Sequence, residues 1–307
     1  MQSSTTTLTT TDGHELFIYS WLPDAPPVAA IYIAHGMAEH AARYARLARE
    51  LTAAGFAVHA NDHRGHGRTS PREEDRGFFA EKDGWARVVA DIAEMIGWVR
   101  QQHPGLKVAF FGHSMGSQLG QDYLQRYNPT VDAAVFSGTT GKPPAIAALG
   151  RIIARAERLR LGKRGRSAII DQMTFKDFNK KFGKTRTDFD WLSRDTAEVD
   201  AYIADPDCGF ICSVQLWVEL LDNLRLFTRD ANQAKTPSDL PLYLFAGDRD
   251  PVGEMGRSVD ALAEDYRRAG LTDVTLQLYP GARHETLNEI NRDVVTRDLL
   301  SWLKARL

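Results

Sequence analysis

Cysteine is nearly absent from the sequence: among 307 residues only Cys208 and Cys212 occur. Two cysteines are too few for a disulfide framework, and they lack the histidine or second cysteine pair that a zinc site requires. We therefore expect two free thiols, which are typical of a reducing compartment. This scarcity favours a cytoplasmic location.

Long apolar runs are absent as well. No stretch approaches the ~18 consecutive apolar residues of a transmembrane helix. The N-terminus, MQSSTTTLTTTDG, has neither the basic segment nor the apolar segment of a secretory signal. We accordingly expect neither a membrane-spanning helix nor a signal peptide.

The chain also lacks an excess of one charge, because 38 Lys and Arg oppose 40 Asp and Glu, a formal net charge of −2. Such a balance gives no overall attraction to nucleic acid, and we expect no nucleic-acid partner. One basic stretch lies at residues 151–166. We interpret it as a solvated helix face or loop, with weak contact to a membrane surface or an anionic substrate as the alternative.

Short apolar runs alternate with helical patterns along most of the chain. This alternation predicts a parallel sheet covered by helices on both faces. The expected strands lie at residues 16–21, 29–34, 56–60, 107–111, 131–136, 240–245 and 275–279. The expected helices between them lie at residues 44–54, 85–102, 114–127, 255–269 and 287–303.

The alternation stops between residues 139 and 236, where no buried strand is evident. Helical patterns occur there instead, at residues 144–161, 175–182 and 212–227. A long helical excursion inside an α/β sheet is typical of a lid or cap over an active site. We therefore predict an α/β core at residues 1–138 and 237–307, and a helical cap at residues 139–236.

A candidate nucleophile lies in Gly112-His113-Ser114-Met115-Gly116, which matches G-x-S-x-G between an expected strand and an expected helix. The chain must turn sharply there, and larger residues two positions before and after the serine would collide. An ordinary glycine-rich turn is the alternative, but the strand before and the helix after favour the nucleophile elbow. We predict Ser114 as the nucleophile.

A serine hydroxyl needs a base, and the base needs an orienting acid. Of nine histidines, only His284 follows the helical excursion, so we predict it as the base. In proteins with a nucleophile elbow of this kind, the acid lies between the serine and the histidine along the chain. Asp250 is preferred over Asp248 because it precedes Pro251 and is therefore biased to an extended conformation. Asp273 is a more distant alternative.

Acyl transfer also generates an oxyanion, which backbone N–H groups must stabilise. One donor is the residue after the nucleophile, Met115. The second should come from the loop that follows the strand at residues 29–34, and there we predict the N–H of Met37.

The loop NDHRGHG, at residues 61–67, raises the possibility of a metal site through His63, His66 and Asp62. We disfavour a metal, because the two histidines are three residues apart in a glycine-containing loop and no third ligand cluster accompanies them. We expect instead that Asp62 and Arg64 form a buried network that supports the loops near Ser114.

Several strings resemble the monoacylglycerol lipase and lysophospholipase group of α/β-hydrolases: HGMAEHAARY, NDHRGHGRTS, FGHSMGS, GDRDPVG and YPGARHETLNE. Within the helical excursion, SRDTAEVDAYIADPDCGF is similar to bacterial members. The resemblance implies the α/β-hydrolase fold, a mostly parallel sheet flanked by helices with a helical cap inserted after the sixth strand. It also implies a triad of Ser114, Asp250 and His284, backbone donors at Met37 and Met115, and no cofactor or metal.

These features predict a serine hydrolase that cleaves carboxylic esters through an acyl-enzyme, with monoacylglycerol or lysophospholipid-like esters as substrates. A short-chain carboxylesterase acting on small soluble esters is the main alternative. A non-catalytic module that binds a small ligand beneath the cap is a remote one. Transient contact of the cap with a membrane surface is left open, and the sequence predicts no oligomeric state.

Overall fold

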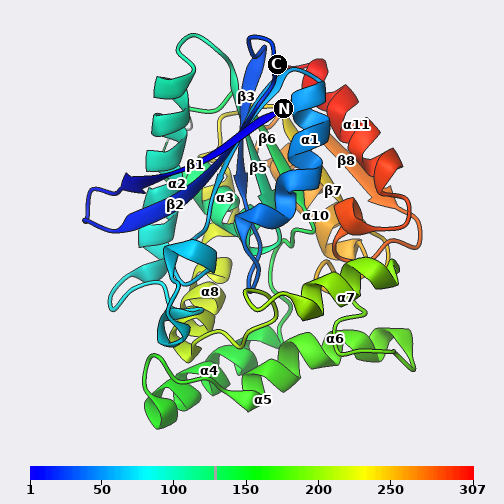
Figure 1. Ribbon diagram of the computed structural model, residues 1–307. Coiled ribbons are helices and arrows are strands. Elements are labelled where there is room, and N and C mark those ends of the chain that lie inside the picture. Colours follow the sequence, from blue (N-terminus) through cyan, green and yellow to red (C-terminus); the bar gives the residue numbers. More distant parts are fainter. Residues whose placement is uncertain (128–129) are drawn as a thin grey trace.

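The computed structural model describes residues 1–127 and 130–307. Its centre is an eight-stranded sheet in the order β1-β2-β4-β3-β5-β6-β7-β8 (Figure 1). The strands are β1 Gln2–Thr9, β2 Glu15–Leu22, β3 Ala29–Ala34, β4 Phe56–Asn61, β5 Val108–His113, β6 Ala133–Ser137, β7 Leu242–Gly247 and β8 Val274–Tyr279. Only the pairs β1–β2 and β2–β4 are antiparallel.

The five strands from β4 to β7 in the sheet order are buried along their whole length. Continuous apolar runs are typical of parallel strands that helices cover on both faces. Here α2, α3 and α10 pack on one face, while α1 and α11 pack on the other. These helices are α1 Ala45–Ala53, α2 Gly84–Gln102, α3 Met115–Arg126, α10 Arg257–Arg268 and α11 Arg292–Lys304.

Strand β1 has no counterpart among the strands that the sequence predicts. Its side chains are almost all exposed, so it lacks the apolar alternation by which a strand is recognised. It is held by its antiparallel register with β2, from Gln2 opposite Leu22 to Thr9 opposite Glu15. With β1 included, the excursion at residues 139–236 follows the sixth strand.

We refer to residues 139–236 as the helical insertion. Its helices α4, α5 and α6 lie in a row beyond one end of the sheet, α7 lies between α6 and the core, and α8 packs beside α3 (Figure 1). Trp85 of α2 stacks on Phe227 of α8 at 5.9 Å between ring centroids, which joins the insertion to the core. The helices are α4 Ala147–Leu161, α5 Ala168–Asp171, α6 Asp177–Asn179, α7 Thr196–Ala204, α8 Val214–Phe227 and α9 Asp230–Gln233.

The expected absence of a transmembrane helix agrees with the structure. Among residues 1–127 and 130–307, every helix is too short or too polar to cross a bilayer.

Candidate active site

The candidate nucleophile lies at a sharp turn between β5 and α3. Ser114 has φ 51° and ψ −120°, a backbone conformation that residues with side chains rarely adopt. The turn depends on close approach of backbones: a Cβ on Gly116 would lie 2.1 Å from the carbonyl oxygen of Ala34. A Cβ on Gly112 would lie 2.7 Å from the carbonyl oxygen of Gly116. Glycine at both positions therefore allows α3 to begin directly after the serine.

The candidate base and acid meet at the same edge of the sheet. His284 lies in the loop after β8, and its Nδ1 is 2.9 Å from Oδ2 of Asp250, in the loop after β7. Both side chains are buried, and the second carboxylate oxygen of Asp250 accepts the N–H of Val252 at 2.9 Å. The structure therefore brings together the histidine and the carboxylate that the sequence favours.

The two alternative carboxylates have other partners. Asp248 accepts the N–H of Gly281 at 2.7 Å and so supports the turn that precedes His284. Asp273 pairs with Arg306 at 2.8 Å, in the last residues of the chain. The structure gives neither of them a contact with His284.

Burial and neighbouring charges shift the pKa of His284 in opposite directions. Burial alone lowers the pKa of the imidazole, whereas the charge and hydrogen bond of Asp250, with the charges of Glu285 and Glu39, raise it. The net result is a pKa above the ordinary value of 6.5. An imidazole with this environment is a stronger proton acceptor than a free histidine.

Ser114 and His284 line one cavity, which the helical insertion closes from the other side. The cavity has a volume of about 30 Å³, close to the space that one water molecule occupies in the liquid. The insertion contributes Trp191, Leu192 and Tyr202 to its wall.

Of the two candidate oxyanion donors, Met37 lines this cavity and Met115 directly follows Ser114 in the chain. Met115 is the first residue of α3, where an N–H group has no partner within the helix. In the loop after β3, the N–H of Gly36 donates to Oε1 of Glu39 at 2.5 Å, and the N–H of Ala38 donates to Nε2 of His66 at 3.2 Å. Between them, the N–H of Met37 has no acceptor in the described part of the chain.

A buried ion network that sequence reasoning missed joins the oxyanion loop to the histidine loop. Arg43 donates to Glu39 at 2.6 Å and, through both terminal nitrogens, to Glu285 at 2.8 Å. Burial raises the pKa of Glu285, but the charge and hydrogen bond of Arg43 outweigh it and hold that pKa below its usual range. The spacing of Glu39 and Arg43, one helical turn apart, is the only signal of this network in the sequence.

Three histidines near the oxyanion loop, His35, His63 and His66, are buried. His35 and His66 lie 5.2 Å apart between ring centroids, and burial lowers the pKa of His66 to about 4. His35 Nε2 accepts the N–H of His63 at 2.9 Å, much as His66 Nε2 accepts that of Ala38. Because backbone N–H groups already occupy these two nitrogens, the rings act as acceptors that shape the loop.

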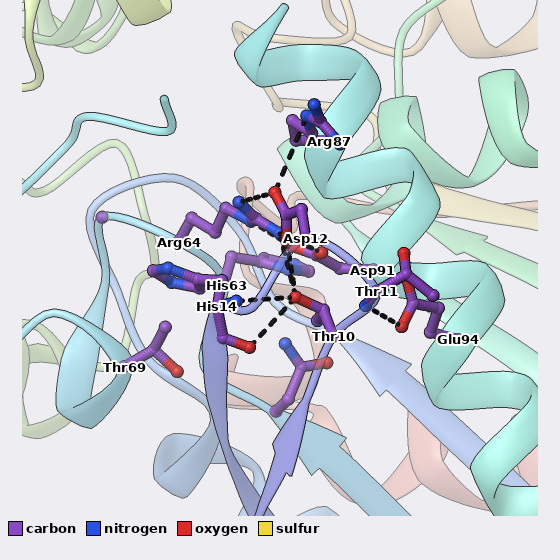
Figure 2. Close-up of polar contacts among 12 residues, drawn as sticks. Thr10, Thr11, Asp12, His14, His63, Arg64, Thr69, Arg87, Asp91 and Glu94 are labelled. Atoms are coloured by element: carbon purple, nitrogen blue, oxygen red, sulfur yellow. Dashed lines mark hydrogen bonds and ion pairs between the residues drawn. The ribbon is translucent and has the colours of Figure 1, made fainter. Parts of the chain in front are cut away.

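Asp62 and Arg64 are both buried and hydrogen-bonded, but they do not share the single network that the sequence led us to expect. Asp62 accepts the N–H groups of Ala41 at 2.8 Å and Arg68 at 2.7 Å. Arg64 extends away from it and donates to Asp12 in the β1–β2 turn and to Asp91 in α2, each at 2.7 Å (Figure 2). Two side chains that are only two residues apart thus belong to two separate networks. The Asp62 network fixes the loop near Ala41, and Arg64 anchors the hairpin to α2.

One group of possible metal ligands occurs among the residues that the structure describes: His40, Asp205 and Cys208, whose ligand atoms lie within 4.8 Å of one another. His40 Nε2 and Asp205 Oδ2 are 2.8 Å apart and link the core to the helical insertion. Burial raises the pKa of the Cys208 thiol, which disfavours the thiolate that would bind a metal. We therefore treat the group as a core-to-insertion contact.

Comparison with known proteins decides the family. The sequence profile described as "Serine aminopeptidase, S33" matches residues 25–291, a span that contains Ser114, Asp250 and His284. The chain belongs to this family. Within it, the chain is 30% identical to the monoacylglycerol lipase of Mycolicibacterium smegmatis, over 94% of this chain and 92% of that protein. It is 28% identical to human monoglyceride lipase, over 97% of this chain and 90% of that protein.

Solved structures of the same fold agree. A thermostable carboxyl esterase from Bacillus coagulans, in complex with glycerol, superimposes with a TM-score of 0.91 at 25% identity, covering 100% of this chain and 99% of that one. A lipase in its open form superimposes with a TM-score of 0.86 at 27% identity, covering 99% of each chain. The predicted α/β-hydrolase fold, the likeness to the monoacylglycerol lipase group and the assignment as an ester hydrolase are confirmed.

Proposed function

We propose that Ser114, His284 and Asp250 form the catalytic triad of this ester hydrolase, and that the N–H groups of Met37 and Met115 form its oxyanion hole. The 2.9 Å contact between His284 and Asp250, at the cavity that Ser114 lines, carries the proposal. Because Nδ1 of His284 faces Asp250, the other ring nitrogen, Nε2, is left to take the proton of Ser114.

The proposed reaction has two halves. In the first, His284 takes the proton as Ser114 Oγ attacks the ester carbonyl, and the two N–H groups stabilise the oxyanion. The imidazolium, held by Asp250, then protonates the departing alcohol, and an acyl-enzyme remains. In the second, His284 takes a proton from water, the resulting hydroxide attacks the acyl carbonyl, and Ser114 regains its proton as the carboxylic acid leaves.

For the substrate, we propose an ester of one acyl chain with a small polar alcohol, such as a monoacylglycerol or a lysophospholipid. Similarity to lipases named for monoacylglycerol, along nearly the whole chain, supports this class. Trp191 and Leu192 supply an apolar wall opposite Ser114. A short-chain carboxylesterase is the second candidate, and the likeness to the Bacillus coagulans carboxyl esterase favours it.

We further propose that the helical insertion, residues 139–236, is a cap that opens at a lipid surface. Helix α4 and its N-cap residue expose apolar side chains at a helical spacing: Ile146 at the N-cap, then Leu149, Ile152 and Leu159 in the helix. Two of the four arginines of this helix, Arg151 and Arg155, share the carboxylate of Asp222, and Arg160 pairs with Glu157. The basic stretch is thus only partly paired, and apolar contact adds to its attraction for a surface.

We also propose a cytoplasmic location. The support is chemical: Cys208 and Cys212 are both free thiols, although only three residues separate them. Free cysteines persist in reducing compartments.

The decisive experiment compares the wild type with Ser114→Ala and with Ser301→Ala, an exposed serine on α11 that serves as the control. A fluorophosphonate probe should label the wild type and Ser301→Ala at one site, and mass spectrometry of the adduct should locate it on Ser114. Ser114→Ala should lose the label and the hydrolysis of p-nitrophenyl butyrate. Labelling elsewhere, or retained turnover in Ser114→Ala, would reject the triad.

A chain-length series separates the two substrate classes. We expect turnover of p-nitrophenyl esters to rise toward medium and long acyl chains, and glycerol to be released from monooleoylglycerol. A preference for acetate and butyrate, without glycerol release, would assign the enzyme to the short-chain carboxylesterases.

A further inference from the structure

A strained residue lies immediately beside the proposed oxyanion donor Met37. Ala38 has φ 53° and a side chain that is 1% exposed. Residues with a Cβ rarely adopt this left-handed conformation, and they keep it only where the surroundings hold it in place. The contacts of Ala38 therefore determine the shape of the oxyanion loop.

Three hydrogen bonds hold Ala38, and two of them come from the helical insertion. Its N–H donates to His66 Nε2 at 3.2 Å, within the core. Its carbonyl oxygen accepts the hydroxyl of Tyr202 at 2.8 Å and the N–H of Gly209 at 2.9 Å. Tyr202 belongs to α7, and Gly209 to the segment between α7 and α8. The core thus fixes one side of the Ala38 backbone, and the insertion fixes the other.

Tyr202 is itself held at the centre of the site. Its side chain is buried, and the guanidinium of Arg43 lies 4.8 Å from its ring centroid. Arg43 in turn bridges Glu39 and Glu285, the residues that border the oxyanion loop and the candidate base. Tyr202 is therefore the point at which the insertion contacts both the oxyanion loop and the ion network.

We propose that Tyr202 is a positioning residue that couples the docking of the helical insertion to the assembly of the oxyanion hole. The proposal rests on the proposed triad and oxyanion donors. Glu39 fixes Gly36 on one side of Met37, and Tyr202 fixes Ala38 on the other. The Met37 N–H therefore points toward the position of the oxyanion only while both contacts exist. Tyr202 does not touch the reacting atoms in this role.

The arrangement has a functional consequence. When the insertion moves away to admit substrate, the carbonyl of Ala38 loses both of its donors at once, and the strained loop keeps only the His66 contact. When the insertion returns, the donors reform and the Met37 N–H is aimed again. The oxyanion hole is thereby complete only while Tyr202 and Gly209 contact the carbonyl of Ala38.

The test replaces Tyr202 with Phe, which keeps the ring over Arg43 and removes only the hydroxyl. We expect kcat for p-nitrophenyl butyrate to fall about tenfold, less than the 100-fold or greater loss on removal of a direct oxyanion donor. KM should stay within about twofold, because the contact acts on the transition state. A trifluoromethyl ketone, which forms a tetrahedral adduct on serine, should lose affinity by a similar factor.

Tyr266→Phe is the matched control. Tyr266 is fully buried in α10, and its hydroxyl has no hydrogen-bond partner among the residues described. Its loss should leave kcat, KM and ketone affinity unchanged. Equal effects of the two variants, or a change in KM alone for Tyr202→Phe, would overturn the proposal, since either result indicates a merely structural hydroxyl.

Ala38→Gly supplies a second test. It keeps the proposal testable even if Tyr202→Phe folds poorly by itself. Glycine adopts positive φ without the penalty that a Cβ brings, so the loop depends less on Tyr202. We expect the Tyr202→Phe loss to shrink to about threefold or less in the Ala38→Gly background. An undiminished loss would overturn the positioning role. Failure of the triad is distinguishable, because it appears as an active Ser114→Ala enzyme whatever residue occupies position 202.

Discussion

At the scale of single residues, the charge around His284 determines the pH range of the enzyme. The imidazole must be neutral to accept the proton of Ser114, so activity appears as the pH rises through its pKa. Asp250, Glu285 and Glu39 raise that pKa above 6.5 against the opposing influence of burial. We therefore expect the acid limb of kcat/KM to lie above pH 6.5, as a pH profile with a soluble ester will show.

Glu285→Gln tests the cause of this shift. Removal of one negative charge beside His284 lowers the pKa of the imidazole, so the acid limb should move to lower pH. The change also leaves Arg43 less neutralised, which acts in the same direction. Glu264→Gln, an exposed residue of α10, is the control and should leave the profile in place. A limb that stays fixed or moves upward in Glu285→Gln would contradict this assignment.

The residue scale also shows what a sequence can and cannot predict about the site. The positions of Ser114 and His284 follow from chain order and from the elements beside them. The partner of Arg43 does not: Glu285 lies 242 residues away, and only the folded sheet brings the two loops together. The expectation that Asp62 and Arg64 share one buried network failed for the converse reason, because closeness in sequence does not give the directions of side chains in a loop.

At the scale of elements, the junction of β3, β5 and α3 requires glycine. In Gly116→Ala the new Cβ would meet the carbonyl oxygens of Ala34 and His35 at 2.1 and 2.6 Å, and these atoms belong to backbone that cannot give way. We expect a loss of about 3 kcal/mol or more in the free energy of unfolding, at or above the upper end of ordinary overpacking. Urea denaturation measures it.

Gly97→Ala is the comparison for this change. Gly97 lies inside α2, and a Cβ there would meet nothing within 4 Å. Alanine is more favourable than glycine in a helix interior, so the free energy of unfolding of this variant should rise by roughly 0.5–1 kcal/mol. Two glycine-to-alanine changes in helices should thus have effects of opposite sign. A mild effect at Gly116 would show that α3 can shift away from β3.

Which elements are recognisable in the sequence depends on how they are buried. The pattern predicts a strand at residues 29–34, and β3 spans Ala29–Ala34, because an apolar run buried on both faces is distinctive. Strand β1 is exposed, so the sequence pattern does not predict it. Helix α7, Thr196–Ala204, is also missed: Val199 and Tyr202 are its only buried residues, so it lacks a clear apolar stripe.

At the scale of the whole molecule, the helical insertion lies over the candidate site. The cavity beside Ser114 is about 30 Å³, and three side chains of the helical insertion line it. The structural likeness to a lipase in its open form shows that the fold has an open counterpart. On the outer side of the same insertion, Leu159 is 87% exposed and Ile146 is 66% exposed. The insertion that lines the candidate site therefore also carries an apolar surface.

Because the same insertion lines the candidate site and exposes apolar side chains, a prediction about lipid surfaces follows. Ile152 of α4 is 64% exposed, and Ile152→Glu places a charge in the apolar row. We expect hydrolysis of monooleoylglycerol in neutral phosphatidylcholine vesicles to fall roughly fivefold, equivalent to about 1 kcal/mol of lost apolar burial. Hydrolysis of soluble p-nitrophenyl butyrate should not change, and vesicle flotation should show weaker binding.

Val28→Glu is the matched control, since Val28 is 62% exposed but lies just before β3, outside the helical insertion. It introduces the same charge on a similarly exposed residue and should affect neither substrate. If Ile152→Glu reduced both activities equally, the change would act on folding or on the site, and surface binding would be rejected. If flotation were unchanged while vesicle hydrolysis fell, the row would act on opening of the insertion after the enzyme has bound, because only the later step would then depend on α4.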